Sequence, residues 1–107
     1  MDITALAAEL GLKEEDVRRL VLTFLDSTEQ DLIQLGEAFS ERDAEKLHAT
    51  AHHIRGAAGN LELNEIADEA RKIEEKARGG IIEDPSDSIS FISSRLDMIR
   101  TDFPLKE

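Results

Sequence analysis

The sequence predicts an all-α protein: an up-and-down antiparallel four-helix bundle with a short N-terminal helix that caps it. Apolar residues recur every three or four positions along most of the chain, which is the period of an amphipathic helix. No segment alternates convincingly with the period of two that a half-buried strand requires. Only 4% of the residues are aromatic, so the core has to consist of Leu, Ile, Val and Ala, which suits helix-on-helix packing.

The length and composition restrict the class of protein. The 107 residues suffice for one hydrophobic core, and we predict a single domain over residues 1–107. With 24 Asp and Glu against 13 Lys and Arg, the net charge of −11 argues against nucleic acid or an anionic membrane surface as a partner. The absence of cysteine excludes disulfides and thiol chemistry. The sequence has no basic and apolar leader and no run of about 18 apolar residues, so we expect a cytoplasmic protein.

The N-terminal part of the chain predicts a short helix over residues 3–10, ended by Gly11 in a position that favours left-handed backbone. A long helix follows over residues 14–40, and the helix dipole favours its acidic start. Its buried stripe consists of Val17, Val21, Phe24, Thr28, Leu32, Leu35 and Phe39. Three apolar residues lie off the stripe: Leu22, Leu25 and Ile33. We expect them to pack on the N-terminal helix, and an exposed docking patch is the alternative.

Three further helices are predicted over residues 43–60, 64–78 and 85–102. Each begins at a side chain that can accept a hydrogen bond from the free backbone N–H groups of a helix start. These predicted caps are Asp43, Asn64 and Asp84. Pro85 suits the first position of the last helix, where its missing N–H is not needed. The apolar stripe of that helix runs to Phe103, and the helix is expected to end before Pro104.

The segment from Leu47 to Leu61 is the most unusual part of the chain. It has the apolar stripe of a buried helix, but it also carries all three histidines and two interior glycines, Gly56 and Gly59. Because an interior Gly costs about 1 kcal/mol relative to Ala, we expect something to approach this backbone closely. One explanation is that the glycines let two helices pack closely and the histidines are solvated. The other is that they open a surface beside a reactive imidazole.

A second line of residues lies beside the buried stripe, because positions three and four apart are neighbours on a helix surface. This line consists of His48, His52, Arg55, Gly56 and Gly59. His48 and His52 also have the spacing of two zinc ligands on a helix, but no third ligand forms a recognisable motif, and we predict no metal site. Periodicity does not choose between His52 and His53, since each flanks the stripe on a different side.

The segment from Ala51 to Leu61, AHHIRGAAGNL, resembles the signature of histidine-containing phosphotransfer (HPt) domains, roughly A-H-x-[LI]-[KR]-G-x-[AS]-x-x-L. The resemblance extends from about Val17 to Phe103. It includes Asp43 at the start of the histidine helix and the string Ala70-Arg71-Lys72-Ile73-Glu74, which is similar to the family's A-x-x-L-E. One departure is Glu62, which stands where such domains often carry a Gly that relaxes the turn into the next helix.

The resemblance implies that His52 is phosphorylated: a neutral imidazole nitrogen accepts a phosphoryl group from a receiver-domain aspartate, or from a sensor kinase, and passes it to another receiver aspartate. Glu74 is expected to support the ring, and Arg55 to neutralise the phosphoryl oxygens. The surface that the partner approaches is expected to consist of Gly56, Gly59 and His48. No nucleotide-binding loop is recognisable, so the chain is not expected to have kinase activity.

The implied partners are a response-regulator receiver domain and a sensor or hybrid histidine kinase. We expect the protein to be a monomer and to have no cofactor of its own. The Mg²⁺ used in such transfer is expected on the receiver. Two alternatives remain: a non-catalytic helical adaptor, and an excised phosphate-accepting domain of a chemotaxis-type histidine kinase. The intact His-x-Ile-Arg-Gly string argues against an adaptor, which has no need of an exposed His beside Gly56.

Overall fold

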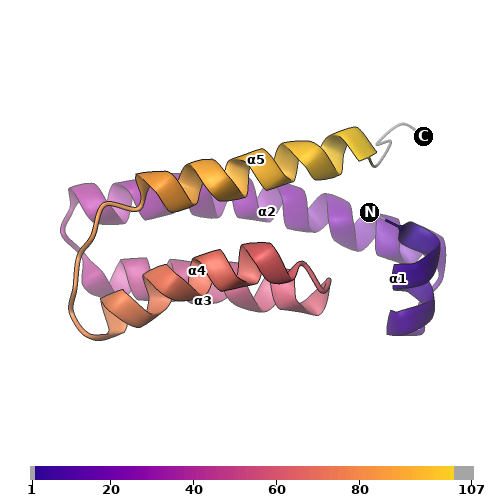
Figure 1. Cartoon of the computed structure of the whole chain (residues 1–107), viewed down its shortest axis with the longest axis horizontal. Coiled ribbons are helices and arrows are strands. Elements are labelled where there is room, and N and C mark those ends of the chain that lie inside the picture. The colour runs from indigo at the N-terminus through magenta and orange to yellow at the C-terminus, as the bar shows by residue number, and fades with distance from the viewer. Residues whose placement is uncertain (1, 103–107) are drawn as a thin grey trace.

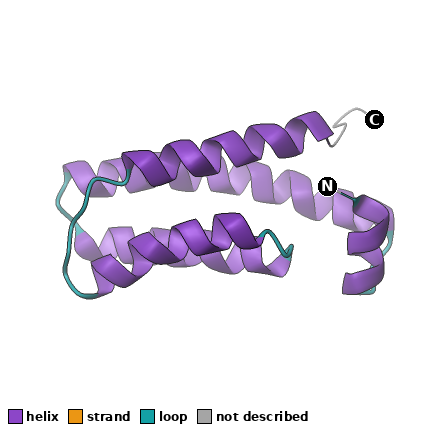
Figure 2. Cartoon of the chain, in the orientation of Figure 1, coloured by secondary structure: helices purple, strands orange, loops and turns teal. Residues whose placement is uncertain are grey.

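The computed structural model describes residues 2–102, and this part of the chain contains helices and connecting loops but no strand (Figure 2). The helices are α1 (Ile3–Leu10), α2 (Glu14–Ser40), α3 (Ala44–Asn60), α4 (Asn64–Arg78) and α5 (Ser86–Asp102). The predicted all-α class is therefore confirmed for these residues. None of these helices combines the length and the apolar character needed to cross a membrane.

The four longer helices lie lengthwise, and the chain reverses direction at each connection between them (Figure 1). α2 contacts α3, α3 packs most extensively on α4, α4 contacts α5, and α5 contacts α2. The short α1 stands across the end of α2 where that helix begins. The histidine helix α3 thus has α2 on one side and α4 on the other, and both neighbours can supply side chains to it.

The core between the helices is aliphatic, as the composition predicts. The apolar stripe of α3 is completely buried, and it belongs to one core with the buried residues of α2, α4 and α5. Phe39, predicted on the buried stripe of α2, is only half-buried, and Ala38 is the core residue at that end of the helix. Among the residues off the α2 stripe, Leu25 is 2% exposed, but Ile33 is 58% exposed. The prediction that Ile33 packs on the N-terminal helix is therefore wrong. The reason is that α1 lies beside the first residues of α2, whereas Ile33 belongs to the last third of that helix. Each residue in between adds about 1.5 Å of length, so the two are too far apart to pack together.

The helix ends confirm most of the predicted caps. Gly11 ends α1 with a φ of 68°. An oxygen of Asp43 accepts from the backbone N–H of Lys46 at 3.0 Å, so α3 begins one residue later, at Ala44. Asp84 Oδ1 accepts from the N–H of Ser86 at 2.9 Å, and the regular helix again begins one residue later than predicted, at Ser86. The end of α5 around Phe103 and Pro104 lies outside the described residues.

The cap predicted at Asn64 is wrong. Asn64 is already the first residue of α4, and the cap position belongs to Leu63, whose side chain offers no hydrogen bond. The cause is the tight turn from α3. The N–H of Leu63 donates to the carbonyl of Ala58 at 2.9 Å, and Glu62 adopts a left-handed conformation with a φ of 58°. Glu62 thus takes the backbone shape for which a glycine is better suited.

Candidate functional site

A buried carboxylate, that of Glu74 on α4, is the centre of the site. Glu74 is 1% exposed, and it lies where α4 packs against α3. A buried charge is unfavourable unless it is paired and hydrogen-bonded, so the partners of Glu74 determine the chemistry of this site.

Two side chains of α3 bind this carboxylate directly. His52 Nδ1 lies 2.6 Å from Glu74 Oε2, and Arg55 Nε donates to Oε1 at 2.5 Å. Arg55 Nη2 donates to Oε2 at a longer 3.4 Å. Burial by itself raises the pKa of Glu74, but the hydrogen bonds from Arg55 and His52 and the charge of Arg55 together hold that pKa below its ordinary value. The carboxylate is therefore ionised at neutral pH.

The short contact between His52 and Glu74 determines where the imidazole proton lies. A ring nitrogen 2.6 Å from an ionised carboxylate oxygen has to carry a hydrogen, because two lone pairs at this distance repel each other. In a neutral ring Nδ1 is then the donor, and Nε2 keeps its lone pair. The side chain of His52 is 61% exposed, so this ring is open to an incoming reactant.

Arg55 supports the carboxylate in this structure. Besides its bonds to Glu74, its Nη2 lies 3.2 Å from His52 Nδ1, which is the ring nitrogen on the Glu74 side. The predicted residues His52, Arg55 and Glu74 are thus brought together in one hydrogen-bonded group. The role expected for Arg55 on phosphoryl oxygens stays a prediction.

Two further groups approach Glu74 Oε2 without a hydrogen bond. Arg78 Nη2 and His48 Nε2 each lie 3.7 Å from this oxygen. The rings of His48 and His52 are stacked, with centroids 6.2 Å apart and planes at 9°. Arg78 was not among the residues predicted for the site, although its position four residues after Glu74 indicates that the two side chains can meet.

The glycines of α3 lie on an open surface. A Cβ atom at Gly56 or at Gly59 would meet nothing within 4 Å beyond the backbone of its own helix. Both residues are exposed. The explanation that they let two helices of this chain pack closely is therefore wrong, because no neighbouring helix occupies that space. One and two turns after His52, the surface of α3 is therefore open backbone.

His53 lies on the other side of α3 and has a different carboxylate. Its Nδ1 is 2.5 Å from Oδ2 of Asp31, which belongs to α2. The two adjacent histidines therefore point toward different neighbouring helices. Asp31 was not predicted as a partner of His53, because nothing in the sequence indicates a contact between residues 22 positions apart.

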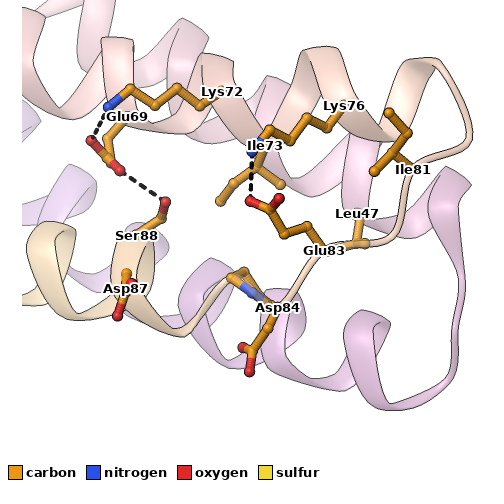
Figure 3. Close-up of a pocket in the computed structure, with 11 residues that line it drawn as sticks. Leu47, Glu69, Lys72, Ile73, Lys76, Ile81, Glu83, Asp84, Asp87 and Ser88 are labelled. Carbon is orange, nitrogen blue, oxygen red and sulfur yellow. Dashed lines mark hydrogen bonds and ion pairs between the residues drawn. The ribbon is translucent and has the colours of Figure 1, made fainter.

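A pocket of about 190 Å³ lies on another flank of α4, against the connection to α5, and Figure 3 shows the residues that line it. Its two lysines are bound to acidic residues: Lys72 to Glu69 at 3.1 Å, and Lys76 to Glu83 at 2.5 Å. Its lining does not include His52, so the exposed imidazole lies outside this cavity. Within residues 2–102 no group of three or more His, Asp or Glu side chains is arranged to hold a metal ion.

The fold and this site define a small helical domain with an exposed histidine held by a buried carboxylate. The sequence matches the family model of the Hpt domain over residues 19–102. The chain therefore belongs to the Hpt domain family, and it has a histidine phosphotransfer role in a phosphorelay. Members of this family are phosphotransfer intermediates that interact with receiver domains and histidine kinases.

A solved structure supports the same assignment. The chain is similar to the crystal structure of histidine-containing phosphotransfer protein B (HptB) from Pseudomonas aeruginosa PAO1. The sequence identity is 27% and the TM-score is 0.81, over 96% of this chain and 90% of that one. No match was found among curated protein sequences.

Proposed function

We propose that His52 is the phosphorylated residue and that its Nε2 is the atom that accepts the phosphoryl group. The observation that carries this proposal is the 2.6 Å contact between His52 Nδ1 and the buried carboxylate of Glu74. This contact keeps one tautomer, in which Nε2 has a free lone pair, and it fixes the orientation of the ring. Pre-organising a nucleophile in this way is a general means of activating it.

The transfer step then needs no proton donor for the leaving group. The Nε2 lone pair forms the new N–P bond, the P–O bond to the receiver aspartate breaks, and its electron pair stays on the aspartate as a carboxylate. The ring gains positive charge while Nδ1 keeps its hydrogen, and the ionised carboxylate of Glu74 stabilises that charge at 2.6 Å. The reverse sequence passes the phosphoryl group to the same or another receiver aspartate.

Arg55 has two tasks in this proposal. Its Nε holds Glu74 Oε1, which keeps the buried carboxylate in place, and its positive charge beside the ring reduces the repulsion of an incoming phosphoryl group. Gly56 and Gly59 keep the neighbouring surface free of side chains, so that receiver loops can reach His52. His48 lies one turn before His52 at the rim of this surface.

The remaining features of the proposal concern the whole chain. We infer that α2 to α5 act as an up-and-down antiparallel four-helix bundle, capped by α1, in a monomer located in the cytoplasm. The partners are a response-regulator receiver domain and a sensor or hybrid histidine kinase. The chain has no kinase activity and no cofactor of its own, and the Mg²⁺ for transfer belongs to the receiver. Whether the chain acts alone or as part of a chemotaxis-type kinase does not change the chemistry of His52.

The experiment compares two histidine variants. The wild type, His52→Gln and His53→Gln are incubated with a phosphorylated receiver domain, and bound phosphate is measured. We expect label on the wild type and on His53→Gln, lost in acid as for a phosphoramidate, and no label on His52→Gln. Label on His52→Gln equal to that of the wild type would refute the assignment. A wild type that takes no label from any receiver would favour the adaptor alternative.

A further inference from the structure

The ring of His48 is incompletely satisfied in this structure. Among the buried side-chain nitrogen and oxygen atoms of residues 2–102, Nε2 of His48 is the one that has no hydrogen-bond partner. It lies 3.7 Å from Glu74 Oε2, slightly too far for a hydrogen bond. A shift of less than about 1 Å would bring the two atoms to hydrogen-bond distance. A buried nitrogen beside a carboxylate is favourable only when that nitrogen carries a hydrogen.

The surroundings of His48 allow a second proton to reach the ring. The side chain is 35% exposed, and the ring borders a cavity of about 480 Å³ that is also lined by Glu45 and Arg78. The titratable and charged groups that face the ring come from α3 and α4. They are Glu45, His52, Glu74 and Arg78. A protonated imidazole carries hydrogen on both nitrogens, so Nε2 would then be a donor whichever neutral tautomer was present before.

Phosphorylation changes the charge beside this ring. A phosphoryl group adds about 1.5 to 2 negative charges near neutral pH. The two rings are stacked with centroids 6.2 Å apart, so the added charge lies close to His48. Arg55 and Arg78 already face the carboxylate of Glu74, and they balance the new charge only in part. Imidazole is the side chain that most readily gains a proton between about pH 5 and 8.

We propose that His48 takes up a proton when His52 is phosphorylated, and that its Nε2 then donates a hydrogen bond to Glu74 Oε2. The inference rests on the proposed function, since it requires a phosphoryl group on His52. By linkage, protonation of His48 stabilises the phosphorylated state to the same extent as phosphorylation favours protonation. His48 is thus a positioning residue that makes the equilibrium between the unphosphorylated and the phosphorylated protein depend on pH.

The direct test uses phosphoramidate as the phosphate donor, so that no partner protein has to be identified. His52 Nε2 forms the N–P bond, the P–N bond of the reagent breaks, and ammonia leaves. Ring nitrogens are then titrated by NMR in the free and phosphorylated full chain. We expect the titration midpoint of His48 to rise by about half to one pH unit on phosphorylation. His53, which is bound to Asp31 on the other side of α3, is the internal control and should shift less.

The outcomes separate this inference from the proposed function. If the mass of the wild type does not increase in phosphoramidate, or if His52→Gln gains the same mass, the proposed function fails. If His52 is phosphorylated and the midpoint of His48 does not move more than that of His53, only the proton uptake is refuted.

A second measurement uses His48→Gln, which keeps a hydrogen-bond donor but does not titrate. The equilibrium constant for phosphoryl transfer from a receiver domain to the wild type, divided by the constant for transfer to this variant, should be about threefold larger near pH 6 than near pH 8, the factor that half a pH unit represents. Taking the ratio removes the pH dependence of the receiver domain, which is common to both measurements. The same ratio for His53→Gln should stay constant with pH. A constant ratio for His48→Gln would overturn the proposal.

Discussion

Gly56 offers the sharpest test of the open surface beside His52. A Cβ atom at this position meets nothing within 4 Å beyond its own helix, so Gly56→Ala introduces no clash. Because Gly costs about 1 kcal/mol relative to Ala inside an exposed helix, the variant should be more stable by up to about 1 kcal/mol. For a domain of this size, that gain raises the melting temperature by about 4 to 8 °C.

A longer side chain at the same position separates folding from partner binding. Gly56→Gln should stay folded, because the space above the glycine is open. Its side chain would stand one turn after His52, where the receiver has to approach. We expect phosphotransfer from a receiver to slow by about tenfold or more, equivalent to about 1.4 kcal/mol in the barrier. Labelling by the much smaller phosphoramidate should change far less.

The assays are thermal unfolding followed by circular dichroism, and labelling rates with the two phosphate donors. Gly36→Gln is the matched control. Gly36 lies on α2, where a Cβ atom also meets nothing within 4 Å, so its substitution should leave transfer unchanged. An unfolded Gly56→Gln variant would refute the open geometry. A folded one that accepts phosphate from the receiver at the wild-type rate would refute the role of Gly56 in partner access.

Three further predictions concern stability. Arg55→Ala removes a hydrogen bond of 2.5 Å from the buried Glu74, so urea unfolding should show a free energy of unfolding lower by about 1–3 kcal/mol. A decrease within about 0.5 kcal/mol would mean that Arg55 acts on the phosphoryl group alone. Because the folded state holds the pKa of Glu74 below its ordinary value of 4.5, the ionised carboxylate stabilises the fold above that pH and the stabilisation is lost as the pH falls. The stability difference between wild type and Glu74→Gln should therefore shrink as the pH falls below 4.5 in urea titrations, and a constant difference would contradict this account. Glu62→Gly should raise the melting temperature by a few degrees, because a φ of 58° is easier for glycine than for glutamate. Glu62→Ala should not raise it, and equal effects of the two substitutions would assign the change to the lost carboxyl group.

The sequence by itself determined the helices and the line of residues that carries the chemistry. Helix periodicity is local: the positions of Leu47, Ala51 and Ile54 define a buried face whatever the helix packs against. Caps such as Asp43 and Gly11 depend on a few neighbouring residues, and they were also predictable. The cap at Asn64 failed because the turn around Glu62 leaves the cap position to Leu63 and makes Asn64 the first residue of α4, which a local pattern does not reveal.

Only the tertiary structure decided what each histidine meets. His52 and His53 flank the same stripe, and their partners, Glu74 and Asp31, come from different helices, 22 positions away in either direction. Such contacts depend on how α3 is rotated between α2 and α4, and periodicity along one helix does not contain that information. From the sequence, therefore, only the resemblance to HPt domains could assign the roles of His52 and Glu74.

The burial of Glu74 depends on the same packing. A charged residue is expected at the surface, and nothing in the composition of the chain indicates that this carboxylate is 1% exposed. It is buried where α3 packs most extensively on α4, and Arg55 and His52 bind its two oxygens there. The packing of α3 on α4 therefore buries a residue type that is normally exposed, and the buried carboxylate keeps a proton on Nδ1 of His52.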